Sequence, residues 1–203
     1  MPLAPGPAID RMNLQDLPAP SDWIRRWSHL VAPGATVLDV ACGRGRHLHW
    51  FARRGHPVAG VDRDAQALAA LAGLGELVHA DIEQGPWPFA GRQFGAVVVT
   101  HYLWRPLLPT LLDSVAAGGV LLYETFAVGN ASVGRPANPD FLLQNGELLR
   151  HCRNASWHVA GYEDGFLERP ARFMQRIAAV RRGAPAQGSA PPRYRLPESG
   201  SLQ

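Results

Sequence analysis

Lysine is absent from the 203-residue sequence, and all 20 basic residues are arginines. A chain without lysine cannot form a Schiff base or anchor pyridoxal phosphate, because both need a lysine amine. It also cannot contain a Walker A phosphate loop, which ends in Gly-Lys-Ser/Thr. Any bound anion must be held by arginine, histidine or backbone N–H groups. Compositional bias accounts for the use of arginine, since the chain is also rich in Gly and Pro.

Cysteine is scarce, and long apolar runs are missing. Cys42 and Cys152 are too few for a disulfide framework, so a reducing, cytoplasmic location is expected. No apolar run approaches the length of a membrane span, and the N-terminus lacks the layout of a signal peptide. The net charge is only +3 and the arginines are scattered, which does not resemble the clustered basic face of a nucleic-acid-binding protein.

Proline divides the chain into three parts. Residues 1–20 contain five prolines and form a lead-in, and residues 184–203 form a Pro/Ser/Gly-rich tail. Between them, residues 21–183 are long enough for one folded domain, and the hydrophobic content of 46% is ordinary for such a domain.

Short apolar strands alternate with helices in the central part. A helix is expected from Ser21 until Pro33, and others at 47–54, 64–71, 107–115 and 147–152. Strands are expected at 36–40, 57–62, 77–80, 94–100, 120–125, 157–163 and 173–181. This alternation indicates an α/β fold with a parallel sheet and helices on both faces. Ligands of such sheets bind beyond the carboxyl ends of the strands, so the turn after Val40 is the first place to examine.

That turn contains Gly43 and Gly45, which let the backbone approach a ligand, and the next helix offers N–H groups. Three acids strengthen the pattern. Asp39 lies inside the first strand, Asp62 ends the second and Asp81 follows the third. Asp62 can accept both hydroxyls of a ribose, and Asp81 can face an adenine edge. A ligand with a ribose, an adenine and an amino-acid end fits all three, which describes S-adenosylmethionine.

A nicotinamide-dependent oxidoreductase is the alternative for a glycine turn in this position. Its fingerprint is G-x-G-x-x-G, and here the third glycine is replaced by Leu48. It also gives no reason for Asp39, because a buried carboxylate is costly unless it is hydrogen-bonded. This alternative is therefore less favoured.

The chain resembles class I S-adenosylmethionine-dependent methyltransferases. The run 37–47 (VLDVACGRGRH) is similar to their first motif, 58–62 (VAGVD) to the second and 79–82 (HADI) to the third. The runs 94–99 (FGAVVV) and 118–122 (GGVLL) resemble strands four and five. Among these enzymes, the Cys-Gly-x-Gly-Arg run is similar to that of small bacterial members near the tellurite-resistance methyltransferases.

The resemblance implies a single Rossmann-like, doubly wound sheet of seven mostly parallel strands, with the last strand antiparallel and helices on both faces. It assigns the two loop glycines to the methionine end of S-adenosylmethionine, Asp62 to its ribose and Asp81 to its adenine. The residues predicted to bind the cofactor are Asp39, Ala41, Cys42, Gly43, Gly45, Arg46, Asp62, Arg63, Asp81, Ile82 and Thr100.

Several of these residues have simpler interpretations. Asp62 can merely cap the following helix, and Asp81 can be a solvated loop acid. Arg46 and His47 are either solvent-facing residues of a first helical turn or lie close to the cofactor carboxylate. His47 and His49 are two residues apart and do not share a helix face, so no metal site is predicted.

Polar and aromatic residues after the fourth and fifth strands are the candidates for the acceptor side. His101, Tyr102 and Glu124 are predicted to be catalytic, with His101 or Glu124 as the base. The residues predicted to contact the substrate are Arg105, Tyr123, Arg135 and Asn138. The tyrosines can instead be core aromatics. The long 126–146 segment is either a lid or a rigid structural loop.

The predicted reaction is an in-line methyl transfer to a small-molecule or metalloid acceptor, in which the protein positions the reactants. Nucleic-acid acceptors are disfavoured, because residues 100–103 (THYL) lack the Asp/Asn-Pro-Pro-Tyr of amino-directed enzymes and neither cysteine follows a proline. The protein is expected to be a monomer or homodimer without a membrane partner. A module that binds S-adenosylmethionine without catalysis is the other alternative.

Overall fold

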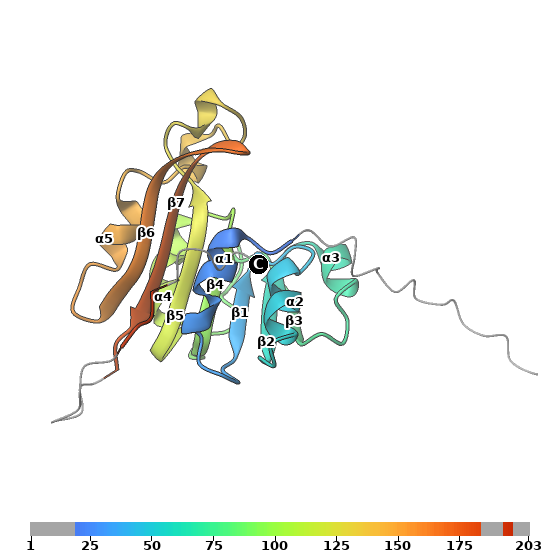
Figure 1. Cartoon of the computed structure of the whole chain (residues 1–203). Coiled ribbons are helices and arrows are strands. Elements are labelled where there is room, and N and C mark those ends of the chain that lie inside the picture. Colours follow the sequence, from blue (N-terminus) through green and yellow to red (C-terminus); the bar gives the residue numbers. More distant parts are fainter. Residues whose placement is uncertain (1–18, 184–192, 197–203) are drawn as a thin grey trace, which may run out of the picture.

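A computed structural model describes residues 19–183 and 193–196 of the chain. The described residues form one seven-stranded sheet with the strand order β3-β2-β1-β4-β5-β7-β6 (Figure 1). The strands are β1 (Val37–Val40), β2 (Val58–Asp62), β3 (Glu76–His79), β4 (Phe94–Thr100), β5 (Val115–Phe126), β6 (Trp157–Glu168) and β7 (Ala171–Arg181). Strands β1 to β5 pair in parallel, whereas β7 is antiparallel to both β5 and β6. The predicted sheet with an antiparallel last strand is confirmed.

The described residues also form five short α-helices and four 3₁₀ turns, which precede or connect the strands. The helices are α1 (Asp22–Trp27), α2 (Arg46–Ala52), α3 (Ala65–Ala69), α4 (Leu108–Asp113) and α5 (Glu147–His151). The 3₁₀ turns are η2 (Ser28–Leu30), η3 (Arg105–Leu107), η4 (Asn130–Ser132) and η5 (Pro139–Phe141). Local side chains fix two of the helix starts, because Ser21 and Asp64 each accept hydrogen bonds from two N–H groups of the first turn.

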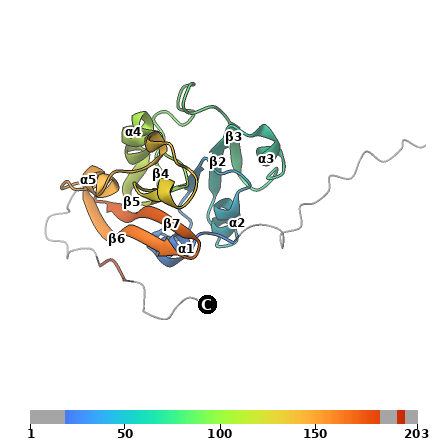
Figure 2. The same cartoon turned by 90° about the horizontal axis from the view of Figure 1, so that it is seen from above.

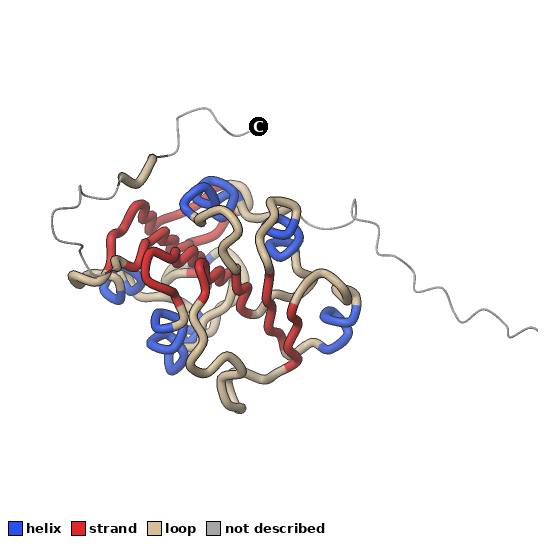
Figure 3. The backbone as a smooth tube through the Cα atoms, turned by 90° about the horizontal axis from the view of Figure 1, so that it is seen from below, coloured by secondary structure: helices blue, strands red, loops and turns tan. Residues whose placement is uncertain are grey.

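The helices cover both faces of the sheet, so the core has two halves (Figures 2 and 3). One half packs α1, α2 and α3 against the sheet through residues such as Trp23, Phe51 and Leu68. The other half packs α4 and α5 through residues such as Leu111 and Leu148. Because the central strands are buried on both faces, their sequences are almost entirely apolar, and the buried Asp39 is the exception in β1.

The strands that follow α4 are much longer than the sequence predicts. Strand β5 begins at Val115, inside the predicted helix 107–115, and has 12 residues. Strands β6 and β7 have 12 and 11 residues and form a hairpin. The outer ends of these strands, including residues 163–168, are mostly polar. They therefore lack the apolar run from which a strand is predicted.

A bulge interrupts the pairing of β6 with β7. Val159 pairs with Ala179, but Gly161 pairs with Ala178, so Ala160 is an extra residue in β6. Gly161 lies directly against the Trp27 ring, where any side chain would collide. The bulge sets which residues of β6 face α1 from this point to the tip of the hairpin.

Candidate active site

The glycine turn after β1 adopts a backbone that favours residues without a side chain. Ala41, Gly43 and Gly45 have φ angles of 53°, 52° and 69°. A Cβ atom on Gly45 would lie 2.7 Å from a methyl carbon of Leu71, whereas a Cβ on Gly43 would meet nothing within 4 Å. Gly45 is thus required both by its backbone angle and by packing, and Gly43 by its backbone angle alone.

Asp62, at the end of β2, is tied to this turn. Its Oδ2 accepts a hydrogen bond of 2.7 Å from the Gly43 N–H, and its Oδ1 accepts one of 2.9 Å from the Asp64 N–H. The side chain that caps α3 is that of Asp64, not Asp62. The carboxylate of Asp62 therefore holds the glycine turn against the end of β2, and its assignment to a ribose stays a prediction.

Asp81, after β3, is exposed and shapes its own loop. One carboxylate oxygen accepts hydrogen bonds from the N–H groups of Glu83 and Gln84, at 2.9 and 3.1 Å. These two bonds lower the pKa of Asp81. Nearby, Ile82 is buried and Arg63 is exposed. The assignment of Asp81 to the adenine, and of Ile82 and Arg63 to the cofactor site, stays a prediction.

Asp39 and His47 form a buried pair beneath the glycine turn. Asp39 is 1% exposed and His47 is 2% exposed. The Ser21 N–H donates to His47 Nε2 at 3.2 Å, so the ring proton is on Nδ1, which lies 3.7 Å from Asp39 Oδ2. That oxygen has no hydrogen-bond partner among the described residues. Of the two interpretations of His47, the solvent-facing one does not hold, because the helix start at Ser21 covers the ring.

A cavity of about 300 Å³ opens beside the turn, at the carboxyl ends of β1 and β4. Its volume is within the range of small-ligand pockets. Five residues of the predicted cofactor site line it, namely Ala41, Cys42, Gly43, Arg46 and Thr100. The other lining residues are Arg44, His47 and His101. Burial raises the pKa of the Cys42 thiol, so this cysteine is an unreactive wall residue.

His101 follows β4 and faces the cavity from the other side. Its ring stacks on Phe126 with the ring centroids 5.0 Å apart, and its Nε2 lies 3.4 Å from a guanidinium nitrogen of Arg172. His101 is an exposed residue, but its neighbours partly shield the ring from water. This shielding, together with Arg46 and Arg172, lowers the pKa of His101 to about 4 against the opposing pull of Glu124. His101 is therefore neutral at pH 7, with its Nε2 lone pair turned toward Arg172.

Glu124 lies on β5, next to Thr100 of β4 and opposite Arg176 of β7. It is 1% exposed, and its Oε2 lies 3.3 Å from Arg176 Nε without the geometry of a hydrogen bond. Arg176 also contacts Glu163 at 3.3 Å, and Glu163 contacts Arg26 of α1 at 3.1 Å. A chain of ion pairs thus fixes the buried carboxylate and holds α1 over it.

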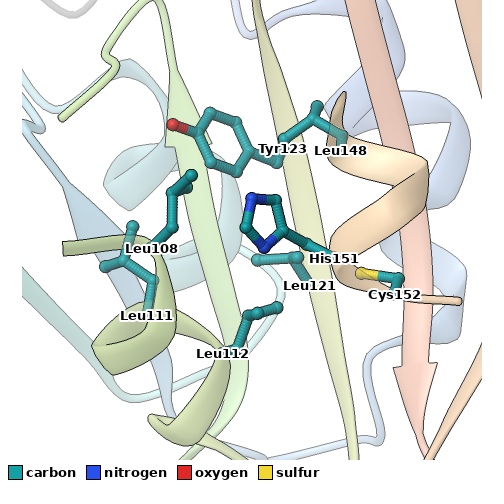
Figure 4. Close-up of a pocket in the computed structure, with 8 residues that line it drawn as sticks. All are labelled: Leu108, Leu111, Leu112, Leu121, Tyr123, Leu148, His151 and Cys152. Atoms are coloured by element: carbon teal, nitrogen blue, oxygen red, sulfur yellow. The ribbon is translucent and has the colours of Figure 1, made fainter. Parts of the chain in front are cut away.

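The two tyrosines have packing positions. The Tyr123 hydroxyl donates to the Tyr102 carbonyl at 2.8 Å. Figure 4 shows the Tyr123 ring among leucine side chains, beside a small cavity of about 10 Å³ between α4 and α5. Burial raises the pKa of both tyrosines, which opposes a role as a phenolate base. The surroundings of Tyr123 give no support to its predicted substrate role.

Arg105 braces the 126–146 segment. Its guanidinium makes two hydrogen bonds to the Glu147 carboxylate, at 2.8 and 3.0 Å, and donates to the carbonyls of Asp140 and Leu142 at 2.8 Å. These bonds use four of its five N–H donors. The expectation that Arg105 holds an anionic substrate therefore conflicts with the structure, because the guanidinium is already committed to the fold.

The other two predicted substrate residues lie on the outside of the same segment. Arg135 and Asn138 are exposed, and the Asn138 side chain accepts the Asp140 N–H at 3.1 Å, which caps η5. The two ends of the segment are joined by a β-bridge between Ala127 and Leu143, in which the Val128 N–H donates to the Leu143 carbonyl at 2.9 Å. Figure 1 shows the segment at the same end of the sheet as the tip of the hairpin. Its role as a lid stays a prediction.

Sequence reasoning missed Arg172 and Arg176 because it treated 173–181 as a plain strand. A usable signal is present, since Arg172 and Arg176 are four residues apart and therefore lie on one face of a mostly apolar strand. Within residues 19–183 and 193–196, no helix has the length and apolar character needed to cross a membrane. In the same residues, no group of three or more His, Cys, Asp or Glu side chains could hold a metal ion.

Comparison with known proteins identifies the class. The family described as "Methyltransferase domain" matches residues 37–118. No curated protein matches the sequence. The structure is similar to TehB from Haemophilus influenzae (TM-score 0.60, 20% identity), covering 80% of this chain and 62% of TehB. It is also similar to an S-adenosylmethionine-dependent methyltransferase from Mesorhizobium loti (TM-score 0.58, 16% identity), covering 76% of this chain and 95% of that one.

A third similar structure is the glycopeptide N-methyltransferase MtfA in complex with S-adenosylmethionine (TM-score 0.54, 19% identity), covering 77% of this chain and 92% of MtfA. Residues 37–118 thus match the family of methyltransferase domains, and the sheet has the fold seen in solved S-adenosylmethionine-dependent methyltransferases. The resemblance seen in the sequence is confirmed. This match also disfavours the nicotinamide alternative.

Proposed function

We propose that the protein transfers a methyl group from S-adenosylmethionine to a small-molecule acceptor, acting as a monomer or homodimer. The observation that best supports this is the cavity at the glycine turn, which brings Gly43, Arg46 and Thr100 together at the carboxyl ends of β1 and β4. His47 lines the same cavity and lies 3.7 Å from the buried Asp39. In open α/β sheets this is where ligands bind, because the strand order reverses there.

The residues around the cavity suit the cofactor. The unpartnered Oδ2 of Asp39 is a buried acceptor that fits an ammonium group, since a buried carboxylate needs such a partner. Arg46, which is half-buried and lines the cavity, suits the carboxylate of the methionine end. Asp62 retains unused lone pairs for ribose hydroxyls. The adenine then extends toward Ile82, Asp81 and Arg63.

The protein acts mainly by positioning. When S-adenosylmethionine is bound, an acceptor lone pair attacks the methyl carbon while the carbon–sulfur electron pair returns to sulfur, so the sulfonium charge is lost. His101 and Thr100 border the cavity at the end of β4, where they limit the approach of the acceptor and of water. His101 is neutral and faces Arg172, and Glu124 is paired with Arg176, so neither is a free proton acceptor.

Calorimetric titration tests the cofactor assignment. S-adenosylmethionine and S-adenosylhomocysteine should both bind, and NAD should not. Asp39→Asn removes a charge without changing the size of the side chain and should weaken binding of both adenosyl ligands by about 1–3 kcal/mol. Asp113→Asn is the matched control, because Asp113 lies at the end of α4 away from the cavity. Lack of binding by folded protein, or binding of NAD instead, would reject the proposal.

Turnover separates an enzyme from a module that only binds the cofactor. Release of S-adenosylhomocysteine is measured across a panel of thiols, phenols, amines and carboxylates. Turnover with one class supports the enzyme and identifies its acceptor. Tight binding of S-adenosylmethionine without turnover on any class supports the binding module.

A further inference from the structure

One face of β7 carries two arginines and a methionine beside the proposed cofactor cavity. Arg172, Met174 and Arg176 alternate along the strand and therefore point to the same side of the sheet. The register places Met174 opposite Phe126 and Arg176 opposite Glu124 on β5. This face is the one covered by α1, since Arg176 lies 5.9 Å from the centre of the Trp23 ring.

The charges on this face do not balance. Arg172, Arg176 and Arg46 act together on one small region, and the buried carboxylate within it is Glu124. Glu163 is shared between Arg176 and Arg26. The remaining nearby acid, Asp22, is exposed and paired with Arg25. The guanidinium groups thus exceed the carboxylates, which favours an anion.

Of these arginines, Arg172 is the best placed to bind that anion. It is half-buried, its buried Nε has no hydrogen-bond partner among the described residues, and its one side-chain hydrogen bond is the 3.4 Å contact with His101. A guanidinium with free donors in a fixed fork matches a carboxylate. Its position beside His101 places such a carboxylate at the edge of the cofactor cavity.

A hollow with both polar and apolar walls lies on the hairpin. It has a volume of about 140 Å³ and is lined by residues 163–167 of β6 with Met174 and Arg176 of β7. Leu167 lies directly opposite Arg172 and Gly165 opposite Met174, so the apolar part of the hollow shares the face of the Arg172 guanidinium. Apolar side chains beside a cation suit an anionic ligand with an apolar body.

We propose that the methyl acceptor is an organic anion, whose carboxylate is held by Arg172 beside His101 and whose apolar body occupies the hollow between β6 and β7. This inference rests on the proposed methyltransferase function. It makes Arg172 the residue that determines acceptor specificity. An inorganic oxyanion would engage the guanidinium but leave the hollow unused.

Ligand pairs that differ in one property test the two parts separately. Benzoate, benzamide and formate are titrated calorimetrically into the full chain, with and without S-adenosylhomocysteine. Benzoate should bind at least about tenfold more tightly than benzamide, because only benzoate makes charge-assisted bonds. It should also bind at least about tenfold more tightly than formate, which has no apolar body.

Substitutions test whether Arg172 causes the preference for benzoate over benzamide. Arg172→Met should reduce benzoate binding to the level of benzamide while leaving benzamide unchanged, and Arg172→Lys should keep part of the preference. Arg153→Met is the matched control, because Arg153 is exposed and follows α5. It should change neither affinity.

The inference would be overturned by equal binding of benzoate and benzamide, by formate binding as tight as benzoate, or by an unchanged preference in Arg172→Met. Absence of benzoate binding up to about 10 mM would also do so. Failure of the proposed function is distinguishable, because S-adenosylhomocysteine is titrated alone and the anion arms are repeated without it.

Discussion

The two ends of the sheet are built in different ways. Strands β1, β2 and β3 have four or five residues each, and the loops that follow them hold the candidate cofactor groups through backbone angles and carboxylates. Strands β5, β6 and β7 have 11 or 12 residues and present charged side chains from the strands themselves. The cofactor end depends on loop backbone, whereas the acceptor end depends on strand register and ion pairs.

We expect the largest effect from Gly45→Ala, which changes only the cofactor end of the sheet. The added Cβ would overlap Leu71, and the φ of 69° disfavours alanine, so the free energy of unfolding should fall by about 2–4 kcal/mol. Chemical denaturation measures it. Gly34→Ala is the control, since Gly34 has a φ of 71° with open space around it, and should lose only about 1 kcal/mol. Equal losses in the two variants would mean that Leu71 does not matter.

Asp62→Ala should remove two interactions made by one carboxylate. It removes the acceptor of the Gly43 N–H as well as the predicted ribose contact, so S-adenosylhomocysteine should bind about 1–3 kcal/mol more weakly. Calorimetric titration measures the change. Asp64→Ala, which removes only the cap of α3, should reduce stability with little change in affinity. An unchanged affinity in Asp62→Ala would reject its role at the cofactor.

Arg105→Met should disturb the acceptor end alone. It leaves Glu147 partly buried without its partner and releases the carbonyls of Asp140 and Leu142, so unfolding should need about 1–3 kcal/mol less. Adding Glu147→Leu should recover part of the loss, because the unpaired carboxylate is gone. Cofactor affinity should stay the same in both variants. A loss of cofactor binding would show that the two ends are coupled through η3.

The smallest effect is a change in the pH dependence of stability. The pKa of His101 in the folded state is about 4, below its value of about 6.5 in an unfolded chain, so the unfolded state takes up its proton first as the pH falls. The contribution of His101 is complete above pH ~6.5 and is lost as the pH falls toward ~4. His101→Asn keeps a residue that tolerates the φ of 55° and should flatten the melting temperature between these values. An unchanged curve would argue against the lowered pKa.

The sequence predicts the cofactor end far better than the acceptor end. Gly43, Gly45 and Asp62 are recognisable because a turn between a strand and a helix needs those residue types at fixed spacings. The fold was also predictable, since the alternating apolar runs leave few topologies. The ion pair between Arg105 and Glu147 could not be predicted, because the two residues are 42 positions apart in the sequence. The same is true of Arg172, whose contact with His101 spans 71 positions.

The bulge at Ala160 determines which side chains of β6 face the proposed acceptor site. Side chains alternate across a sheet, so one extra residue in β6 decides that Glu163 meets Arg176 and that Leu167 meets Arg172. A pairing without the bulge would place Ala160 opposite Ala178 and Glu163 opposite Gln175, so every following side chain of β6 would face the other side of the sheet. A one-residue irregularity, remote from the groups that would touch the acceptor, therefore selects which side chains of β6 border the acceptor site.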